Sequence, residues 1–351
     1  MLKVVNVAQM AEFDDIIDVR SPAEFAEDHV PGALNFPVLD NEERARIGTM
    51  YKQVSSFDAK KAGAALVSRN IGRHLEGELS TRPRGWKPLV YCWRGGKRSG
   101  AMAHVLDQVG WHTGQLDGGY KAYRRQVLED LQTLPARFEW RVVCGATGSG
   151  KSRLLQALAA CGAQVLDLED LANHRGSLLG NVPDLPQPAQ KYFESLIWAK
   201  LHGFNPKLPV YVEAESKKIG TVRVPEALIA AMWQSRCIRI EAETAQRVVL
   251  LKEEYAHFLE QPDDLNHKLG FLADIHGKER IARWQEMANR GEWDTLVAEL
   301  LEQHYDPAYT RSTLKHYPSY AEGLVLQPQD LGAEAMLDMA RELLATSDTP
   351  S

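Results

Sequence analysis

Residues 141–162, RVVCGATGSGKSRLLQALAACG, decide the fold of the larger part of this chain. An apolar run, a glycine-rich stretch and then apolar residues at helical spacing predict a strand, a loop and a helix in that order. The same alternation continues downstream, where further strands are predicted in QVLDLED (164–170), LPVYVEAES (208–216) and RCIRIEAE (236–243). Strands that alternate with helices indicate a parallel sheet.

The glycine-rich stretch fits the pattern G-x-x-x-x-G-K-[ST], the phosphate-binding loop or P-loop, in the strand-to-helix context that this motif requires. Backbone N–H groups of such a loop cradle a phosphate, while Lys151 pairs with the outer phosphate and Ser152 offers a ligand to Mg²⁺. The predicted phosphate-binding residues are Gly145, Thr147, Gly148, Ser149, Gly150, Lys151 and Ser152.

Two carboxylates follow the strand predicted in residues 208–216. Glu213 and Glu215 are candidates for completing a metal site or for acid–base work beside the P-loop. The alternative interpretation is a pair of glutamates that faces solvent at the end of a strand.

The first part of the chain gives a second unit of the same kind. Strands are predicted in VVNVAQ (4–9), DDIIDVR (14–20) and PLVYCW (88–93). The stretch RSGAMAHVLDQVG (98–110) predicts a helix that Gly110 ends. Cys92 therefore lies where a buried strand gives way to a short loop and a helix.

The loop YCWRGGKRS (91–99) surrounds Cys92 with features that favour a thiolate. The pKa of a cysteine falls from about 8.5 to about 3.5–7.5 beside cations or a helix N-terminus. Glycines let successive N–H groups turn inward, and three cations add positive charge. We predict Cys92 as the nucleophile and Arg94, Gly95, Gly96, Lys97 and Arg98 as its anion-binding loop. The alternative is a buried strand-end cysteine beside a solvated turn.

The other cysteines, Cys144, Cys161 and Cys237, lie in apolar contexts and are predicted to be small core residues. No C-x-x-C pair occurs, which argues against a disulfide framework and against a zinc site. The 351 residues, 44% hydrophobic and 25% charged, include no long apolar run. We therefore expect a cytoplasmic protein without a membrane segment.

Net charge is -6, but positive charge is concentrated locally. Residues 60–100 contain ten Lys and Arg residues against two Glu residues. Such a stretch is either a solvated basic face or a surface for a polyanion, and its continuation into the cysteine loop favours the polyanion. The predicted nucleic-acid contacts are Lys60, Lys61, Arg69, Arg73, Arg82 and Arg84.

The pattern of elements divides the chain into domains. A first α/β domain is predicted for residues 1–130, a linker for 131–139 and the P-loop α/β domain for 140–245. After residue 245 the apolar spacing becomes helical, and residues 246–351 are predicted to form a helical C-terminal extension.

Several segments carry a resemblance to known families. DVRSPAEFAEDHVPGALNFP (18–37), the cysteine loop and LDGGYKAY (116–123) resemble a rhodanese domain. Fused to a P-loop domain, this resembles the bacterial tRNA 2-selenouridine synthases. ANHRGSLLG (172–180), VEAESKKIG (212–220) and HYDPAY (304–309) extend the resemblance over nearly the whole chain.

The resemblance implies an α/β fold in which a rhodanese-like parallel-sheet domain precedes a P-loop NTPase-like α/β domain with a helical C-terminal extension. Asp18, Arg20 and His29 belong to the rhodanese framework, and we interpret them as structural. One departure is the loop length. Ordinary rhodaneses place four residues between the cysteine and the closing cation, whereas this loop has five, Trp93 to Lys97. The longer loop implies a wider pocket, and it is shared with phosphatases related to rhodanese.

The resemblance also implies a two-step reaction on the wobble 2-thiouridine in the anticodon arm of tRNA. The thiocarbonyl sulfur first attacks geranyl diphosphate, held by the P-loop, to give an S-geranyl nucleoside. Selenium from selenophosphate, carried on Cys92, then replaces the geranylthio group to give 2-selenouridine. No tightly bound cofactor is implied, and Mg²⁺ is a candidate ion at the P-loop.

Two rival functions remain open at this stage. A thiosulfate sulfurtransferase fused to a small-molecule kinase would explain both loops separately. A regulatory module whose two domains only bind ligands would require no catalysis.

Overall fold

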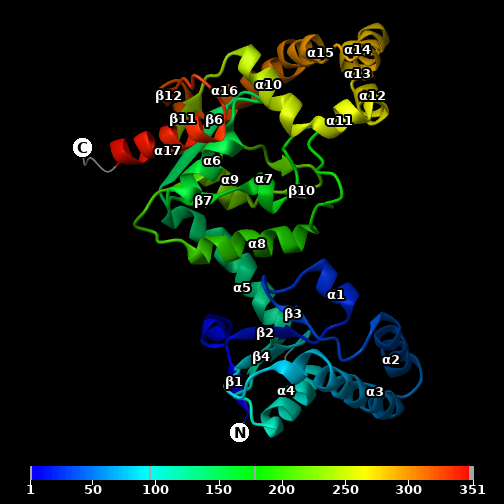
Figure 1. Cartoon of the computed structure of the whole chain (residues 1–351). Helices are drawn as coiled ribbons and strands as arrows, with labels where there is room; N and C mark the ends of the chain where they lie inside the picture. The colour runs from blue at the N-terminus through cyan, green and yellow to red at the C-terminus, as the bar shows by residue number, and fades with distance from the viewer. Residues whose placement is uncertain (1, 95, 178, 348–351) are drawn as a thin grey trace. The chain divides into compact units, whose positions relative to one another are not determined.

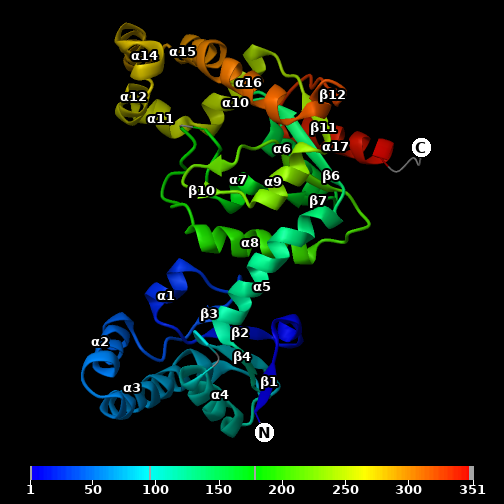
Figure 2. The same ribbon diagram turned by 180° about the vertical axis from the view of Figure 1, so that it is seen from behind.

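The computed structural model describes residues 2–94, 96–177 and 179–347, and the chain divides into two compact units. Unit 1 comprises Met1–Leu131 and Pro188–Ala199, and unit 2 comprises Gln132–Gln187 and Lys200–Ser351. Figures 1 and 2 show the elements of each unit from opposite sides. The stretch 131–139 holds the end of helix α5 and the short 3-10 helix η3 (Leu134–Arg137).

Unit 1 contains a five-stranded sheet in the order β1-β5-β4-β2-β3, and every neighbouring pair is parallel. Its strands are β1 (Lys3–Val5), β2 (Asp15–Asp18), β3 (Leu34–Asn35), β4 (Pro88–Tyr91) and β5 (Gly114–Leu116). Its helices are η1 (Val7–Glu12), α1 (Pro22–Glu27), α2 (Asn41–Gln53), α3 (Ser56–Glu76), η2 (Glu78–Thr81), α4 (Lys97–Val109) and α5 (Gly119–Thr133). Gly110 ends α4 in the left-handed region, as the sequence predicts.

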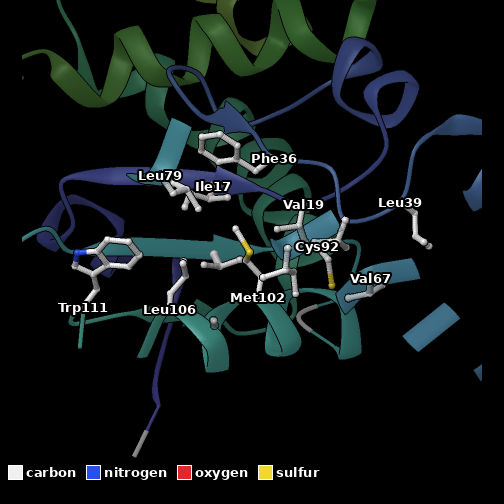
Figure 3. Packing of buried hydrophobic residues seen from close by; sticks show 14 of the residues in the cluster. Ile17, Val19, Phe36, Leu39, Val67, Leu79, Cys92, Met102, Leu106 and Trp111 are labelled. Carbon is white, nitrogen blue, oxygen red and sulfur yellow. The ribbon is translucent and has the colours of Figure 1, made fainter. Parts of the chain in front are cut away.

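The core of unit 1 lies between the sheet and helices α3 and α4. Ile17 of β2, Val90 of β4 and Met102 of α4 are fully buried in one apolar cluster. Cys92 belongs to the same cluster and, in Figure 3, lies beside Val67 of α3. The strand β4 is buried along its whole length, which is typical of a central strand covered on both faces.

Asp18 and Arg20 form a buried ion pair at the end of β2. Their side chains are 0% and 1% exposed, and Arg20 Nη2 lies 2.6 Å from Asp18 Oδ2. The guanidinium also donates to the carbonyl oxygen of Asp28 (2.6 Å) and lies over the ring of Tyr120 (4.0 Å). Arg20 thus ties the loop after α1 and the start of α5 to the sheet, which agrees with a structural role.

A segment distant in sequence completes unit 1. Helix α8 (Gln190–Gly203) begins in this unit, where Ser195 donates to the buried carboxylate of Asp28 (2.7 Å). The ring of His29 stacks between Phe25 (3.7 Å) and Tyr192 (4.2 Å). Residues 188–199 therefore pack in unit 1, although they fall inside the range 140–245 that the sequence assigns to the P-loop domain.

Unit 2 contains a second parallel sheet, in the order β12-β11-β6-β8-β7. Its strands are β6 (Trp140–Gly145), β7 (Gln164–Leu166), β8 (Val210–Glu213), β11 (Arg236–Ile240) and β12 (Leu324–Leu326), and β9 (Lys218–Ile219) pairs with β10 (Val222–Arg223) in a separate antiparallel ribbon. Helix α6 (Lys151–Ala160) and the last helix, α17 (Ala333–Ser347), pack in one core cluster with Val143 and Ile238 of the sheet. All four strands that the sequence predicts here are confirmed.

The remaining helices of unit 2 are α7 (Leu168–Leu171), α9 (Glu226–Trp233), α10 (Thr244–Glu254), α11 (Ala256–Glu260), α12 (Pro262–Gly270), α13 (Ala273–His276), α14 (Lys278–Arg290), α15 (Trp293–Leu300), the π-helical turn η4 (Leu301–Tyr305), α16 (Asp306–His316) and η5 (Pro318–Tyr320). The helical C-terminus is confirmed, with one difference. Strand β12 returns to the edge of the sheet beside β11, and its three residues are too short a run to be recognised by periodicity.

The buried pair in unit 1 generates a prediction about stability. Arg20→Met leaves the carboxylate of Asp18 buried without its partner, so we expect the variant to lower the free energy of unfolding by about 3–5 kcal/mol. Urea unfolding followed by hydrogen–deuterium exchange of peptides from β2 and β4 measures this change in unit 1. The control is Lys3→Met, which breaks the exposed pair of Lys3 with Glu12 and should have little effect. Equal stability of the two variants would contradict a structural role for Arg20.

Candidate active sites

The first candidate site is the loop between β4 and α4. Strand β4 ends at Tyr91, Cys92 follows, and α4 begins at Lys97 after its N-cap residue Gly96. Cys92 is 4% exposed and lies at the carboxyl end of the strand, as Figure 3 shows. The predicted loop residue Gly95 lies outside the described residues.

Residues 116–123 hold the cysteine loop in place. The backbone N–H of Tyr120 donates to the carbonyl oxygen of Cys92 (2.8 Å), and that of Lys121 donates to Trp93 (3.0 Å). The ring of Tyr120 also lies 5.3 Å from that of Trp93. These contacts give the segment LDGGYKAY a function in the fold, because they fix the backbone on which the thiol is mounted.

Burial and several hydrogen bonds act in opposite directions on the Cys92 thiol. Burial by itself raises the pKa of Cys92. The Ser99 hydroxyl, whose Oγ lies 3.2 Å from Sγ, acts in the opposite direction, as do the backbone N–H groups of Ser99, Gly96 and Arg94. Together these hydrogen bonds outweigh burial, and the pKa of Cys92 falls below its usual value. Gln115 orients this hydroxyl by donating to Ser99 Oγ (2.9 Å). The ring of donors agrees with the predicted amide nest, whereas the sequence did not single out Ser99 or Gln115.

The three cations of the loop have different environments. Arg98 is half-buried and pairs with Glu24 of α1, with Nη1 2.9 Å from Oε2. Its charge is therefore used to hold α1 against α4. Arg94 and Lys97 are exposed, and within the described residues they form no ion pair. These two remain available to an anion that approaches Cys92.

The second candidate site is the P-loop between β6 and α6. Gly148 and Gly150 have φ values of 77° and 88°, which a residue with a side chain rarely adopts. A Cβ atom on Gly145 would lie 2.3 Å from Ser149 Oγ. Lys151 Nζ donates back across the loop to the carbonyl oxygen of Gly145 (2.7 Å), and the buried hydroxyl of Ser149 has no hydrogen-bond partner among the described residues.

The helical C-terminal part of unit 2 braces this loop. Arg247 of α10 donates to the carbonyl oxygen of Thr147 (2.9 Å) and pairs with Asp306 of α16 (2.6 Å). Tyr309 accepts a hydrogen bond from the backbone N–H of Gly145 (2.6 Å). Asp306 and Tyr309 belong to the HYDPAY segment, so this segment positions the P-loop from a distant part of the sequence.

A carboxylate that the sequence did not predict lies beside Ser152. Ser152 Oγ donates to Glu169 Oε2 (3.1 Å), and Glu169 shares a hydrogen bond with Glu215. Glu213 is different, because its Oε1 caps α7 by accepting from the N–H groups of Leu168 (2.7 Å) and Glu169 (2.9 Å). Glu213 is 1% exposed, whereas Glu215 is half-buried and lines the cavity described below.

Burial raises the pKa values of Glu169, Glu213 and Glu215, and their mutual repulsion raises those of Glu213 and Glu215 further. Among the described residues no three His, Cys, Asp or Glu side chains form a metal site on their own. The Ser152 hydroxyl and Glu169 nevertheless suit Mg²⁺, which takes few protein ligands and completes its shell with phosphate oxygens and water.

The P-loop opens into a cavity of about 560 Å³. Besides the P-loop, its lining includes Glu169, Arg175, Glu215, Tyr255 and Tyr309. Arg175 lies over the ring of Tyr255 (4.8 Å), and its Nη1 is buried without a hydrogen-bond partner in the described structure. Arg175 lies in ANHRGSLLG, and the cavity thus presents two cations, Lys151 and Arg175, to an anionic ligand.

The cations predicted to contact nucleic acid occupy two regions of unit 1. Lys60, Lys61, Arg69 and Arg73 are exposed on α3, which passes Cys92 at Val67. Arg82 and Arg84 precede β4. They therefore lie near the amino end of this strand, whereas Cys92 follows its carboxyl end. Arg82 is also half-buried in a pair with Asp15 (2.8 Å), so the six residues do not form one continuous surface.

The remaining cysteines have the predicted settings: Cys144 and Cys237 are buried, and Cys161 is partly buried. No helix in the described part of the chain has the length and apolar character needed to cross a bilayer.

The donors around Cys92 generate a prediction about its reactivity. Ser99→Ala removes a hydrogen bond that favours the thiolate, so the pKa of Cys92 should rise. We expect alkylation by iodoacetamide at pH 7 to slow several-fold and its pH profile to shift upward. The rate measured with a Cys92→Ser variant gives the contribution of the other cysteines and is subtracted. The matched control is Ser80→Ala, a substitution of the same kind on an exposed turn. An unchanged profile would show that Ser99 does not stabilise the thiolate.

Comparison with known families assigns both units. The rhodanese-like domain family matches residues 4–126, and the family described as the tRNA 2-selenouridine synthase AAA domain matches residues 138–271. The chain is similar to the tRNA 2-selenouridine synthase of Hydrogenovibrio crunogenus, with 33% identity over 84% of this chain and 88% of the relative. It is 31% identical to that of Sulfurovum sp. over 90% of this chain and 86% of the relative.

Other relatives are matched over a shorter part of their length. The tRNA 2-selenouridine synthase of Nitrosomonas europaea is 37% identical over 68% of this chain, and the match spans 63% of that relative, which is less than two thirds. The similarities to these two relatives, each over more than four fifths of both proteins, together with a match to a family model in each unit, decide the assignment. The chain belongs to the tRNA 2-selenouridine synthase family.

Proposed function

We propose that this protein converts the wobble 2-thiouridine of tRNA to 2-selenouridine through an S-geranyl intermediate, with geranyl diphosphate and selenophosphate as substrates. The observation that carries the proposal is the pairing of two anion-binding sites on one chain. One surrounds the thiol of Cys92, and the other is a cavity of about 560 Å³ that includes Lys151 and Arg175. Membership of the family supplies the substrate class.

The first step is assigned to the P-loop cavity. The thiocarbonyl sulfur attacks C1 of the geranyl group, the C–O bond breaks, and diphosphate leaves with the bonding electrons. The leaving group gains negative charge, which the P-loop N–H groups, Lys151 and Arg175 stabilise. Mg²⁺ held by Ser152 and Glu169 would supply further positive charge to the diphosphate.

The second step is assigned to Cys92. The Cys92 thiolate, stabilised by Ser99 and the backbone N–H groups, attacks C2 of the base, and geranylthiol leaves with the bonding electrons of the C2–S bond and a proton. The selenium of selenophosphate then displaces Cys92 from C2, and water cleaves the P–Se bond to give 2-selenouridine and phosphate. Arg94 and Lys97 are exposed beside this loop and are proposed to attract the selenophosphate anion.

The tRNA is proposed to approach Cys92 over the first half of α3. Lys60 and Lys61 lie on this half, before Val67, whose side chain lies beside Cys92. Contacts of this kind go to phosphates and depend on salt. The wobble base lies in a single-stranded loop, so it can leave the stack and enter a site.

Two variants test the chemistry. Cys92→Ser should stop selenium transfer while S-geranyl tRNA accumulates, because alkylation requires the diphosphate site and not the thiol. Lys151→Ala should weaken diphosphate binding and leave the thiouridine unmodified. Mass spectrometry of wobble nucleosides after incubation of the full chain with thiolated tRNA, geranyl diphosphate and selenophosphate measures both products.

The same experiment distinguishes the other functions. Normal selenouridine yield from Cys92→Ser, or equal geranylation by Lys151→Ala and the parent, would remove the assigned roles. ATP turnover with no RNA requirement would instead indicate a sulfurtransferase fused to a kinase, and the absence of any turnover would indicate a binding module.

The tRNA surface generates its own prediction. Reversing charge with Lys60→Glu and Lys61→Glu should raise the Kd for tRNA about tenfold or more at moderate salt, because phosphate contacts are lost. The matched control is Arg84→Glu with Lys87→Glu, which makes the same charge change at the sheet edge away from Cys92 and should have a smaller effect. Filter binding at several salt concentrations measures both. A larger loss of affinity in the control would place the tRNA on the opposite edge.

A further inference from the structure

Unit 2 contains a second cavity, of about 60 Å³, whose lining is almost entirely apolar. Helices α10, α11, α12 and α15 contribute to it, and its lining includes Leu251, Phe258, Leu265, Leu296 and Leu300. All five of these side chains are less than 10% exposed. The lining contains one cation, Lys252, and this ammonium pairs with Asp294 (2.5 Å). The cavity therefore offers nothing to an anion and suits a hydrocarbon.

This apolar cavity adjoins the phosphate cavity. Five residues line both spaces: Thr147, Ser177, Leu251, Tyr255 and Tyr305. Thr147 is a residue of the P-loop itself. The two cavities are therefore immediate neighbours, and the apolar cavity lies next to a ligand whose anionic head is on the P-loop.

The boundary between the two cavities separates charge from hydrocarbon. On the phosphate side, Arg175 lies over the ring of Tyr255, and Ser177 Oγ lies 3.4 Å from the hydroxyl of Tyr255. On the apolar side, the ring of Phe258 is stacked with that of Tyr255, with ring centroids 6.0 Å apart. The aromatic ring of Tyr255 thus contacts a cation in one cavity and apolar carbon in the other.

We propose that the apolar cavity receives the distal isoprene unit of a prenyl diphosphate whose diphosphate lies on the P-loop. This inference rests on the proposed function, which requires such a substrate. The volume of the apolar cavity, about 60 Å³, is less than that of a whole isoprene unit, so the cavity takes the branched dimethyl end of that unit. The first isoprene unit stays in the larger cavity, next to the P-loop. The apolar cavity then makes chain length a determinant of specificity, since dimethylallyl diphosphate lacks the distal isoprene unit that would enter it.

The test compares three ligands with the intact protein by calorimetry: inorganic diphosphate, dimethylallyl diphosphate and geranyl diphosphate. Burial of one further isoprene unit should make geranyl diphosphate bind on the order of 100-fold tighter than dimethylallyl diphosphate. Val297 of α15 is half-buried and lines the apolar cavity, so Val297→Trp should fill it and remove this preference. Binding of inorganic diphosphate should be unchanged.

The matched control is Thr295→Trp, which adds the same side chain at an exposed position of α15 outside the cavity lining and should keep the preference. Loss of inorganic diphosphate binding by Val297→Trp would mean that the substitution disturbs the P-loop. The smaller substitution Val297→Phe and the comparison of ligands on the parent protein then test the inference. Equal affinity of the parent for both prenyl diphosphates, or a preference that survives filling of the cavity, would overturn the inference.

The design separates this inference from the proposed function. A geranyl preference that Val297→Trp removes, in a protein that fails to geranylate tRNA, would support the apolar pocket and refute the proposed reaction. Geranylation of tRNA by a protein whose affinity does not depend on chain length would support the proposed reaction and refute the apolar pocket. Failure of the parent to bind any of the three ligands would overturn both.

Discussion

The ion pair between Arg247 and Asp306 sets the geometry of the phosphate site. The guanidinium of Arg247 also donates to the carbonyl oxygen of Thr147, so one side chain joins the P-loop, α10 and α16. Arg247 is 6% exposed, and a charge so buried is stable only while its partners hold their places. The loop, the helical C-terminus and the cavity between them therefore form one structural unit, in which a shift of α16 also moves the P-loop backbone.

The two candidate sites solve the same electrostatic problem with different means. In each, a parallel strand ends in a loop that turns N–H groups toward one point at the start of a helix. At Cys92 the group that ionises belongs to the protein, and neutral donors from Ser99 and the backbone lower the pKa of its thiol. At the P-loop the negative charge is proposed to come from the ligand, and the cavity adds the fixed cations Lys151 and Arg175.

The parts of the fold and of the two sites that could be predicted from the sequence are those whose residues are continuous in the chain. The strands around Cys92 and Lys151 were correct because a buried strand, a glycine loop and a helix form one uninterrupted pattern. Glu169, Arg175 and Tyr309 were missed because they reach the P-loop from other elements, and only the fold brings them together. The pairing of Arg82 with Asp15 could not be foreseen for the same reason, since the two residues are 67 positions apart.

Helix α8 has a consequence for how this protein is made. The five strands and five α-helices of unit 1 lie before residue 134, but its last helical segment, Pro188–Ala199, follows more than fifty residues later. On the ribosome, the sheet of unit 1 can therefore pair while Asp28 still lacks the hydroxyl of Ser195, and His29 still lacks the ring of Tyr192. Synthesis of residues 132–187 of unit 2 must precede this closure, so a gene fragment ending between the two sheets would encode a unit 1 that lacks both contacts.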